Sequence, residues 1–244
     1  MRPNGENEDD FTPEALLRNF HSQRNEDEED RIANSIYDLP ALLQTNFTSQ
    51  LLSFGRLHIQ GNASVRASPL QLCADEVIIE GKIDVHGSGC QGGTGRGSPS
   101  NVDRCGNAGA SYGGQGGAGA PLDPTDPGMQ EECKKAIRPI YGEYGHIRYE
   151  GSGGGGMKGG AGGGLVYVNA AKMIDITGTI NARGKGAELS GHDGVSDLEE
   201  NGGGGSGGGI ELMAPAFSGN GSIFADGGSG ALNGGGGAGG RVKV

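Results

Sequence analysis

The sequence has no tryptophan, and only six tyrosines and six phenylalanines among its 244 residues. Aromatic side chains supply much of the area buried in a conventional core, so a globule packed around bulky side chains is not expected. No run of 18 apolar residues occurs, so no membrane-spanning helix is predicted. The N-terminal MRPNGENEDDFTPEALL has no apolar segment typical of a signal peptide.

Basic residues are fewer than acidic ones, 19 against 30, and the net charge is −11. Proteins that bind nucleic acid need clustered Lys and Arg to displace counterions, so no nucleic-acid partner is expected. Residues 1–50 hold eleven acidic and four basic side chains, a local net charge of −7. Most of the excess negative charge therefore lies in this N-terminal part.

Catalytic motifs are also missing or lack their context. The stretch 204–208 matches GxSxG, but glycine flanks it on both sides instead of a strand and a helix. No GK[ST] sequence supports a phosphate-binding loop. The five histidines are scattered, and the acids that a polysaccharide lyase or hydrolase would need lie in loops. We expect no catalytic residues and no enzymatic activity.

Glycine is abundant instead, with 53 residues, about three times the usual share. The blocks GGAGGG, GGSGGG and GGAGG precede strand-like segments that begin at Leu165, Ile210 and Arg241. The first two segments alternate apolar and polar residues and return through Gly-Thr/Ser-Ile-x-Ala. An earlier copy begins at Leu70 and a weaker one at Gly55. Alternation with period two indicates strands with one apolar face.

No single copy can cover its own apolar face, so stacking of copies is expected to bury it. The sequence therefore predicts an all-β fold, a parallel β-helix-like solenoid over 51–244. The glycine blocks are predicted to pack as extended threefold helices of the polyglycine II type, which pair N–H with C=O between neighbours. Residues 1–50 are predicted to form an acidic, partly helical extension, with helices at 12–20 and 30–43. It either caps the solenoid or is a linker.

Residues 87–164 interrupt the repeat, and they include a predicted helical turn at 129–136. Such inserts often carry specificity. The alternative is a disulfide-pinned lid over one face. The candidate ligand-facing aromatic residues of the insert are Tyr112, Tyr141, Tyr144 and Tyr149.

The four cysteines are Cys73, Cys90, Cys105 and Cys133. They form no CxxC and show no zinc-like spacing, so disulfides are a better interpretation than a metal site. Three pairings are open if all four are linked. We favour Cys90 with Cys105 and Cys73 with Cys133, although the sequence does not decide among them.

A second insert at 184–201 carries an acidic cluster, Asp193, Asp197, Glu199 and Glu200. Calcium binds several oxygen ligands, so calcium is the one cofactor considered, and no other is predicted. The alternative is a solvated charged loop. Glycosylation sequons occur at Asn46, Asn62 and Asn220, and they favour an extracellular or cell-surface location.

Three features together carry a resemblance: CGNAGASYGG at 105–114, YEGSGGG at 149–155, and the glycine blocks followed by strand units. Over about 55–244 the chain resembles the glycine-rich β-solenoid regions of very large eukaryotic surface and secreted proteins of plants, protists and animals. The resemblance implies a parallel right-handed β-helix-like architecture in an extracellular structural or adhesive protein. It supplies no catalytic residues to carry over. The acidic start and the missing signal peptide depart from it.

The first functional hypothesis is a non-enzymatic structural protein or module of an extracellular fibre, matrix or surface appendage. Stacked glycine-rich β-coils would join it to neighbouring copies in a filament. The alternative hypothesis is a carbohydrate-binding or carbohydrate-processing β-helix protein, with glycans bound at the tyrosine-bearing insert. Ice binding is a third, weaker hypothesis, because the threonine ladder of such surfaces is missing.

Overall fold

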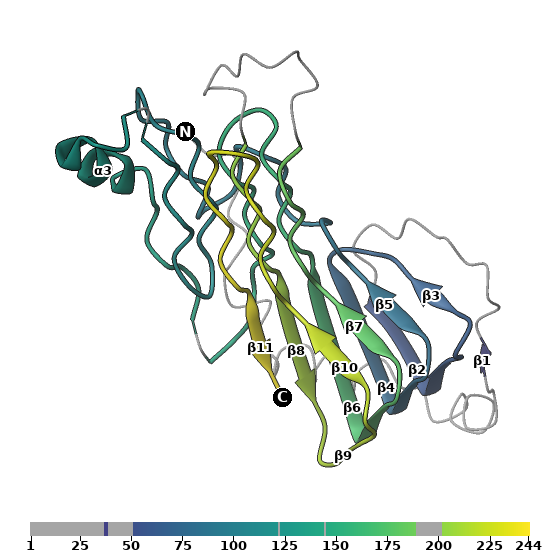
Figure 1. The fold of residues 1–244 in the computed structure, drawn as a ribbon. Coiled ribbons are helices and arrows are strands. Elements are labelled where there is room, and N and C mark those ends of the chain that lie inside the picture. The colour runs from purple at the N-terminus through teal and green to yellow at the C-terminus, as the bar shows by residue number, and fades with distance from the viewer. Residues whose placement is uncertain (1–36, 39–50, 122, 144, 189–201) are drawn as a thin grey trace, which may run out of the picture. The chain divides into compact units, whose positions relative to one another are not determined.

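The computed structural model describes residues 37–38, 51–121, 123–143, 145–188 and 202–244 (Figure 1). All the described elements belong to one compact unit, Tyr37–Val244. The predicted helix at 12–20 and most of the one at 30–43 lie outside the described residues. None of the described helices has the length and apolar character needed to span a bilayer.

The larger sheet, sheet A, has seven strands, and all its pairings are parallel. Its order is β1-β2-β4-β6-β8-β11, and β9 also pairs with β6. We call each successive strand position across this sheet a rung. The strands are β1 (Tyr37–Asp38), β2 (Leu51–Ile59), β4 (Leu70–Ile79), β6 (Leu165–Ile176), β8 (Gly209–Met213), β9 (Phe217–Ser218) and β11 (Arg241–Lys243).

The smaller sheet, sheet B, has four parallel strands in the order β10-β7-β5-β3. They are β3 (Ser64–Val65), β5 (Lys82–Asp84), β7 (Thr179–Asn181) and β10 (Ser222–Phe224). Along the chain, β2 leads to β3, β4 to β5, β6 to β7, and β8 with β9 to β10 (Figure 1). Each pass of the chain therefore adds one rung to both sheets.

Alternating apolar side chains of both sheets form the core. Leu57, Val77 and Ile174 lie on neighbouring strands of sheet A in register, and all three are buried. Ile83 and Ile180 are neighbours in sheet B and belong to the same hydrophobic cluster. Because β-branched residues suit a pleated surface, the Val- and Ile-rich stretches form strands. Burying each such side chain stabilises the fold by roughly 1.5–3 kcal/mol.

Glycine segments lie beside the sheets and form no helix or strand; we call them the glycine layer, residues 87–97, 106–119, 151–164, 182–187, 202–208 and 225–240. Figure 1 shows them as wavy coils above the strands. At their centre, residues 202–208 are buried throughout. The N–H groups of 203–208 donate in turn to three neighbouring segments, and the same segment returns every third residue. The donor–acceptor pairs are Gly203–Gly155, Gly204–Gly235, Gly205–Lys185, Ser206–Ser152, Gly207–Ala238 and Gly208–Ala182.

The close approach of these segments requires glycine. A Cβ atom on Gly204 would overlap the carbonyl oxygen of Gly228, and one on Gly207 would overlap that of Ala225. Main chain therefore packs directly against main chain, and the hydrogen-bond distances of the six donors are 2.7–3.0 Å.

The prediction of a parallel β-helix-like solenoid is wrong. The chain is β-rich and its strands are parallel, as predicted, but they form two separate sheets that do not close into a coil. The chain returns from sheet B to sheet A through glycine segments. These segments bond to several neighbours around their axis, so they add no third ladder of strands.

Two predictions of local helix had different outcomes. The turn predicted at 129–136 is confirmed by α3 (Pro127–Lys134), where the Asp126 side chain accepts hydrogen bonds from the N–H groups of Gly128 and Met129. The helix predicted over 30–43 is wrong at Tyr37–Asp38, which form β1. Apolar residues four apart favour a helix locally, but pairing with Leu57 and His58 of β2 gives a strand.

Adjacent glycines in the glycine layer provide a matched test of close packing. A Cβ on Gly237 would overlap the carbonyl oxygen of Gly205, whereas one on Gly236 would come no closer than 3.8 Å to Gly228. Gly237→Ala should lower the free energy of unfolding by roughly 1–3 kcal/mol, as expected for overpacking. Gly236→Ala should leave it unchanged or raise it slightly, because the unfolded chain loses entropy. Urea unfolding of both variants measures the difference, and equal effects would contradict the packing described here.

Candidate functional site

Sheet A ends at β11, which pairs with β8; the described residues place no strand on its other side. The N–H of Arg241 donates to the carbonyl oxygen of Gly208 at 3.0 Å, toward β8. In a parallel ladder, the N–H and C=O groups of one residue point to the same neighbouring strand, and those of the next residue point to the opposite side. The N–H and C=O of Val242 therefore face the unpaired side. The edge of β11 can bond a further strand.

An apolar column of the core reaches this edge and remains open there. Val242 is in register with Ile210, Val166 and Leu70 of the preceding rungs. Those three side chains are 0–2% exposed, whereas Val242 is 47% exposed. Val242 therefore occupies a core position of the last rung without the cover that the earlier rungs have.

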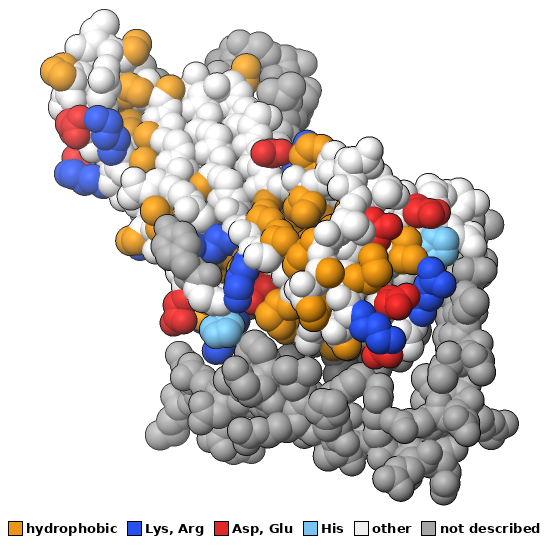
Figure 2. All heavy atoms as spheres, turned by 90° about the horizontal axis from the view of Figure 1, so that it is seen from below, with side chains coloured by type: hydrophobic (Ala, Val, Ile, Leu, Met, Phe, Trp, Pro, Cys, Tyr) orange, Lys and Arg blue, Asp and Glu red, His pale blue; other side chains and the backbone are white. Residues whose placement is uncertain are grey.

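Two further apolar residues near this end are exposed: Val244, at 67%, follows β11, and Phe217, at 42%, lies in β9. Figure 2 shows hydrophobic side chains gathered over part of the face seen from below, with charged side chains beside them. Exposed apolar side chains that gather in this way are typical of interaction sites.

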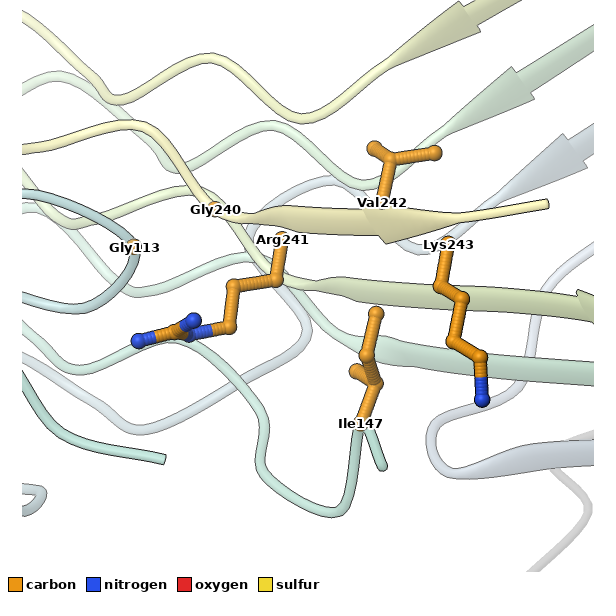
Figure 3. A pocket seen from close by; sticks show the side chains of 6 residues that line it. All are labelled: Gly113, Ile147, Gly240, Arg241, Val242 and Lys243. Atoms are coloured by element: carbon orange, nitrogen blue, oxygen red, sulfur yellow. The ribbon is translucent and has the colours of Figure 1, made fainter. Parts of the chain in front are cut away.

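The face of β11 that points away from the Val242 side chain contacts the 87–164 insert. Figure 3 shows Arg241 and Lys243 on the side of Ile147, with Val242 pointing the other way. Arg241 donates to the carbonyl oxygen of Tyr141 at 2.9 Å. A hollow of about 210 Å³ lies here, lined by Gly113, Ile147, Gly240, Arg241, Val242 and Lys243.

A buried carboxylate fixes β11 to both β8 and the insert. Glu211 of β8 is 2% exposed, and it accepts hydrogen bonds from the ammonium group of Lys243 at 2.7 Å and from the N–H of Ile147 at 3.0 Å. The ammonium of Lys243 also donates to the carbonyl oxygen of Gly145 at 2.6 Å. A buried charge needs such partners to offset its desolvation. The ionic groups beside the hollow thus bond within the chain and hold the last rung in place.

Three tyrosines of the insert, Tyr112, Tyr141 and Tyr149, come together, and one of them is fully buried. The ring of Tyr112 is fully buried and stacks on Tyr141 at 4.7 Å between centroids. The hydroxyl of Tyr112 donates to the carbonyl oxygen of Tyr149 at 2.7 Å, and that of Tyr141 donates to the carbonyl oxygen of Glu150 at 2.8 Å. Burial raises the pKa of Tyr112, and it raises the pKa of Tyr141 to about 12.

The interpretation of these rings as ligand-facing therefore does not describe Tyr112, which has no exposed surface. Tyr149 lies edge-on to Tyr141 at 5.9 Å, and the Arg96 guanidinium lies 4.5 Å from the centre of its ring. Tyr144 lies outside the described residues. The three described rings anchor the insert beside β11.

The disulfide pairing differs from the one favoured above. Cys105 is bonded to Cys133, with 5.5 Å between their Cα atoms, and Cys73 and Cys90 are free. Helix α3 brings Cys133 back to Cys105, where both pack with Met129. Cys73 lies on β4 beside Asn169, and the thiol of Cys90 donates to Glu150 at 3.3 Å. Spacing along the chain did not predict this, because the insert folds back on itself.

Two sequons lie at opposite edges of sheet B. Asn62 and Asn220 are exposed, and each lies two residues before an edge strand, β3 and β10 respectively. Asn46 lies outside the described residues, and so do the calcium candidates Asp193, Asp197, Glu199 and Glu200. Among the residues that are described, no group of three or more His, Cys, Asp or Glu side chains could hold a metal ion.

The sequence analysis missed the Glu211–Lys243 pair. Both residues lie seven positions after the first glycine of their block, Gly204 for GGSGGG and Gly236 for GGAGG, and in a parallel stack such equivalent positions become neighbours. Opposite charges at equivalent positions of two repeat copies were the available signal. Their partner Ile147 belongs to the insert, where no repeat predicts its position.

The thiol of Cys90 provides a test of the environment of the insert. Burial, with the hydrogen bond and charge of Glu150 next, raises the pKa of Cys90 from 9.0 to about 11. Below pH 9.0 the folded protein should hold about 100-fold less thiolate at this residue than the unfolded chain. Alkylation of a Cys73→Ser variant, followed across pH by mass spectrometry, should show this delay and a rise toward pH 11.

The same shift affects stability, because the folded-state pKa exceeds the unfolded one. The contribution of the protonated Cys90 thiol to the free energy of unfolding is fully present below pH 9.0 and is lost as the pH rises to about 11. Alkylation at pH 8 that is as fast in the folded protein as in urea would contradict the buried position of Cys90.

No family model, curated protein or solved structure matches this chain, so its function is inferred from the sheet edge and the side chains described above.

Proposed function

We propose that this protein is a non-enzymatic structural protein or module of an extracellular fibre, matrix or surface appendage, and that it works by self-association. One observation carries the proposal. At the end of sheet A, Val242 occupies a core position but is 47% exposed, and its backbone groups face an unpaired edge. Such an edge is a template for pairing with another chain.

The edge is held in a defined geometry, which favours assembly of a fixed structure. Glu211 and Lys243 fix β11 to β8 and to the insert through an ion pair whose carboxylate is buried. The glycine layer continues directly into β8 and β11 through Gly208 and Gly240. A preorganised strand loses less conformational entropy on pairing than a mobile one.

The extracellular location in this proposal is supported by the Cys105–Cys133 disulfide and by the exposed sequons at Asn62 and Asn220. Disulfides form and persist in oxidising compartments, and N-glycosylation modifies surface asparagines of secreted proteins. The resemblance of the glycine blocks and the CGNAGASYGG run to regions of large eukaryotic surface and secreted proteins belongs to the same proposal.

Carbohydrate binding finds less support in the geometry. Its candidate aromatic site was the set of tyrosines in the insert, and the ring of Tyr112 is fully buried while its hydroxyl bonds to the main chain. Tyr141 stacks on that ring and also bonds to the main chain. These rings stabilise the insert instead of presenting a flat face to a sugar.

Charge placed at Val242 tests self-association through this edge. We expect the wild-type protein to form oligomers larger than a dimer as its concentration rises, measured by analytical ultracentrifugation and electron microscopy. Val242→Lys should raise the dissociation constant roughly ten- to hundredfold, because burial of one valine contributes about 1.5–3 kcal/mol. Met157→Lys changes a fully exposed apolar residue away from the edge and is the matched control.

Met157→Lys should assemble as the wild type does. A monomer at every concentration, stabilised against heat by a glycan, would overturn the structural proposal and favour the carbohydrate-binding alternative. Assembly of Val242→Lys at wild-type strength would show that the edge of β11 is not the contact.

A further inference from the structure

The two ends of sheet A are stepped. At the β11 end, β8 and then β11 continue the sheet over its first half, where Val242 follows Ile210 and Val166 in register. Over its second half, β9 pairs with β6, and the described residues add no strand beyond β9. The first half therefore extends one rung further than the second.

The opposite end of the sheet carries the reverse step. Strand β1 pairs with β2 at Leu57 and His58, in the second half of the sheet. In the first half of β2, the structure places no described strand on the outer side of Leu51–Phe54. Here the second half extends one rung further than the first.

The pairing registers place these two steps at matching positions along the strands. Tyr37 of β1 lies at the level of Leu57, Val77, Ile174 and finally Phe217 of β9. Lys243 of β11 lies at the level of Glu211, Tyr167, Gln71 and finally Leu51 of β2. A second copy whose β2 lies beside β11 would thus place its β1 beside β9 and its Leu51 beside Lys243.

On this basis we propose that the protein's partner is a second copy of the same chain, docked head to tail. Strand β11 of one copy and β1 of the next together form one complete rung between β8 with β9 and the next copy's β2. The proposal rests on the structural function proposed above and names its contact. Neither half-strand completes this rung alone, which is why the second copy fits the exposed edge.

The same displacement keeps the strands of sheet B at matching levels. Ser222 of β10 lies at the level of Thr179, Lys82 and finally Ser64 of β3. Ile223 lies at the level of Ile180, Ile83 and Val65 in the same way. Ile180 and Ile83 are fully buried, whereas Ile223 and Val65, at the two ends, are only partly buried. From one copy to the next, sheet A shifts by five rungs, whereas four described strands of sheet B lie beside those rungs, so β10 and the next copy's β3 lie at matching levels with one strand position between them.

A contact of this kind is heterologous, because each copy uses a different surface at each end. It generates an open filament, or a ring if the rotation between copies closes. A back-to-back dimer would instead place two β11 edges antiparallel and leave both β2 edges unpaired. The two arrangements place different residues beside Ser218.

Engineered disulfides distinguish them. Neighbouring strands lie about 4.8 Å apart, within the range of about 4.4–6.8 Å between the Cα atoms of a disulfide. The registers place Asp38 of β1 at the level of His58, Ile78, Asp175 and finally Ser218 of β9, so Ser218 of one copy lies beside Asp38 of the next. Full-length protein made without glycosylation, so that Asn62 and Asn220 carry no glycan, is prepared as Ser218→Cys and as Asp38→Cys. The two variants are mixed, oxidised, and digested for mass spectrometry of linked peptides.

We expect a link between residues 218 and 38 in the mixture. Replacing the first variant with Ser222→Cys, an exposed serine of sheet B, should abolish this link. Wild-type protein oxidised in parallel shows any links formed by Cys73 and Cys90, and unchanged thermal unfolding shows that each variant is folded.

Each outcome decides the question. A 218–38 link in the mixture supports the head-to-tail contact. A 218–218 link, or oligomers without either link, overturns that contact while leaving self-association intact. Absence of oligomers in the wild type and in every variant overturns both the contact and the proposed function.

Discussion

The N–H groups of residues 203–208 donate in rotation to three neighbouring segments, and the rest of the fold is attached to this arrangement. The rotation requires backbones to approach each other more closely than a Cβ atom allows, as the positions of Gly204 and Gly207 show. Ordering glycine costs more backbone entropy than ordering any other residue. Each net hydrogen bond contributes only about 1 kcal/mol, so the glycine layer depends on many bonds formed together.

This constraint explains why the two sheets remain separate and why their last rung is open. The glycine segments enter the strands directly: Gly208 precedes β8 and accepts a bond from the N–H of Arg241, the first residue of β11. Segments that bond around their axis cannot also supply a planar third ladder. The apolar columns therefore run between two sheets only. They end at Val242 in sheet A and at the partly buried Ile223 in sheet B.

Much of the strand pattern could be predicted from local periodicity, including the segments that became β4, β6, β8 and β10 and their parallel arrangement. Whether the strands close into a solenoid could not be predicted, because repeat spacing shows that copies stack but not which partner each returning segment bonds. The pairing of Cys105 with Cys133 was missed for a similar reason, since it depends on how α3 folds back within the insert. The candidate edge at Val242 was visible in the sequence only as the beginning of another strand.

The sequence by itself determined which stretches are strands and which are glycine segments, because alternation of apolar side chains and absence of Cβ atoms act within a few residues. Tertiary structure alone decided the register, and with it the stepped edges, the exposure of Val242 and the burial of Glu211 beside Lys243. Register is a relation between residues far apart in the chain. It arises from the simultaneous fit of both sheets and the glycine layer, which no single repeat copy contains.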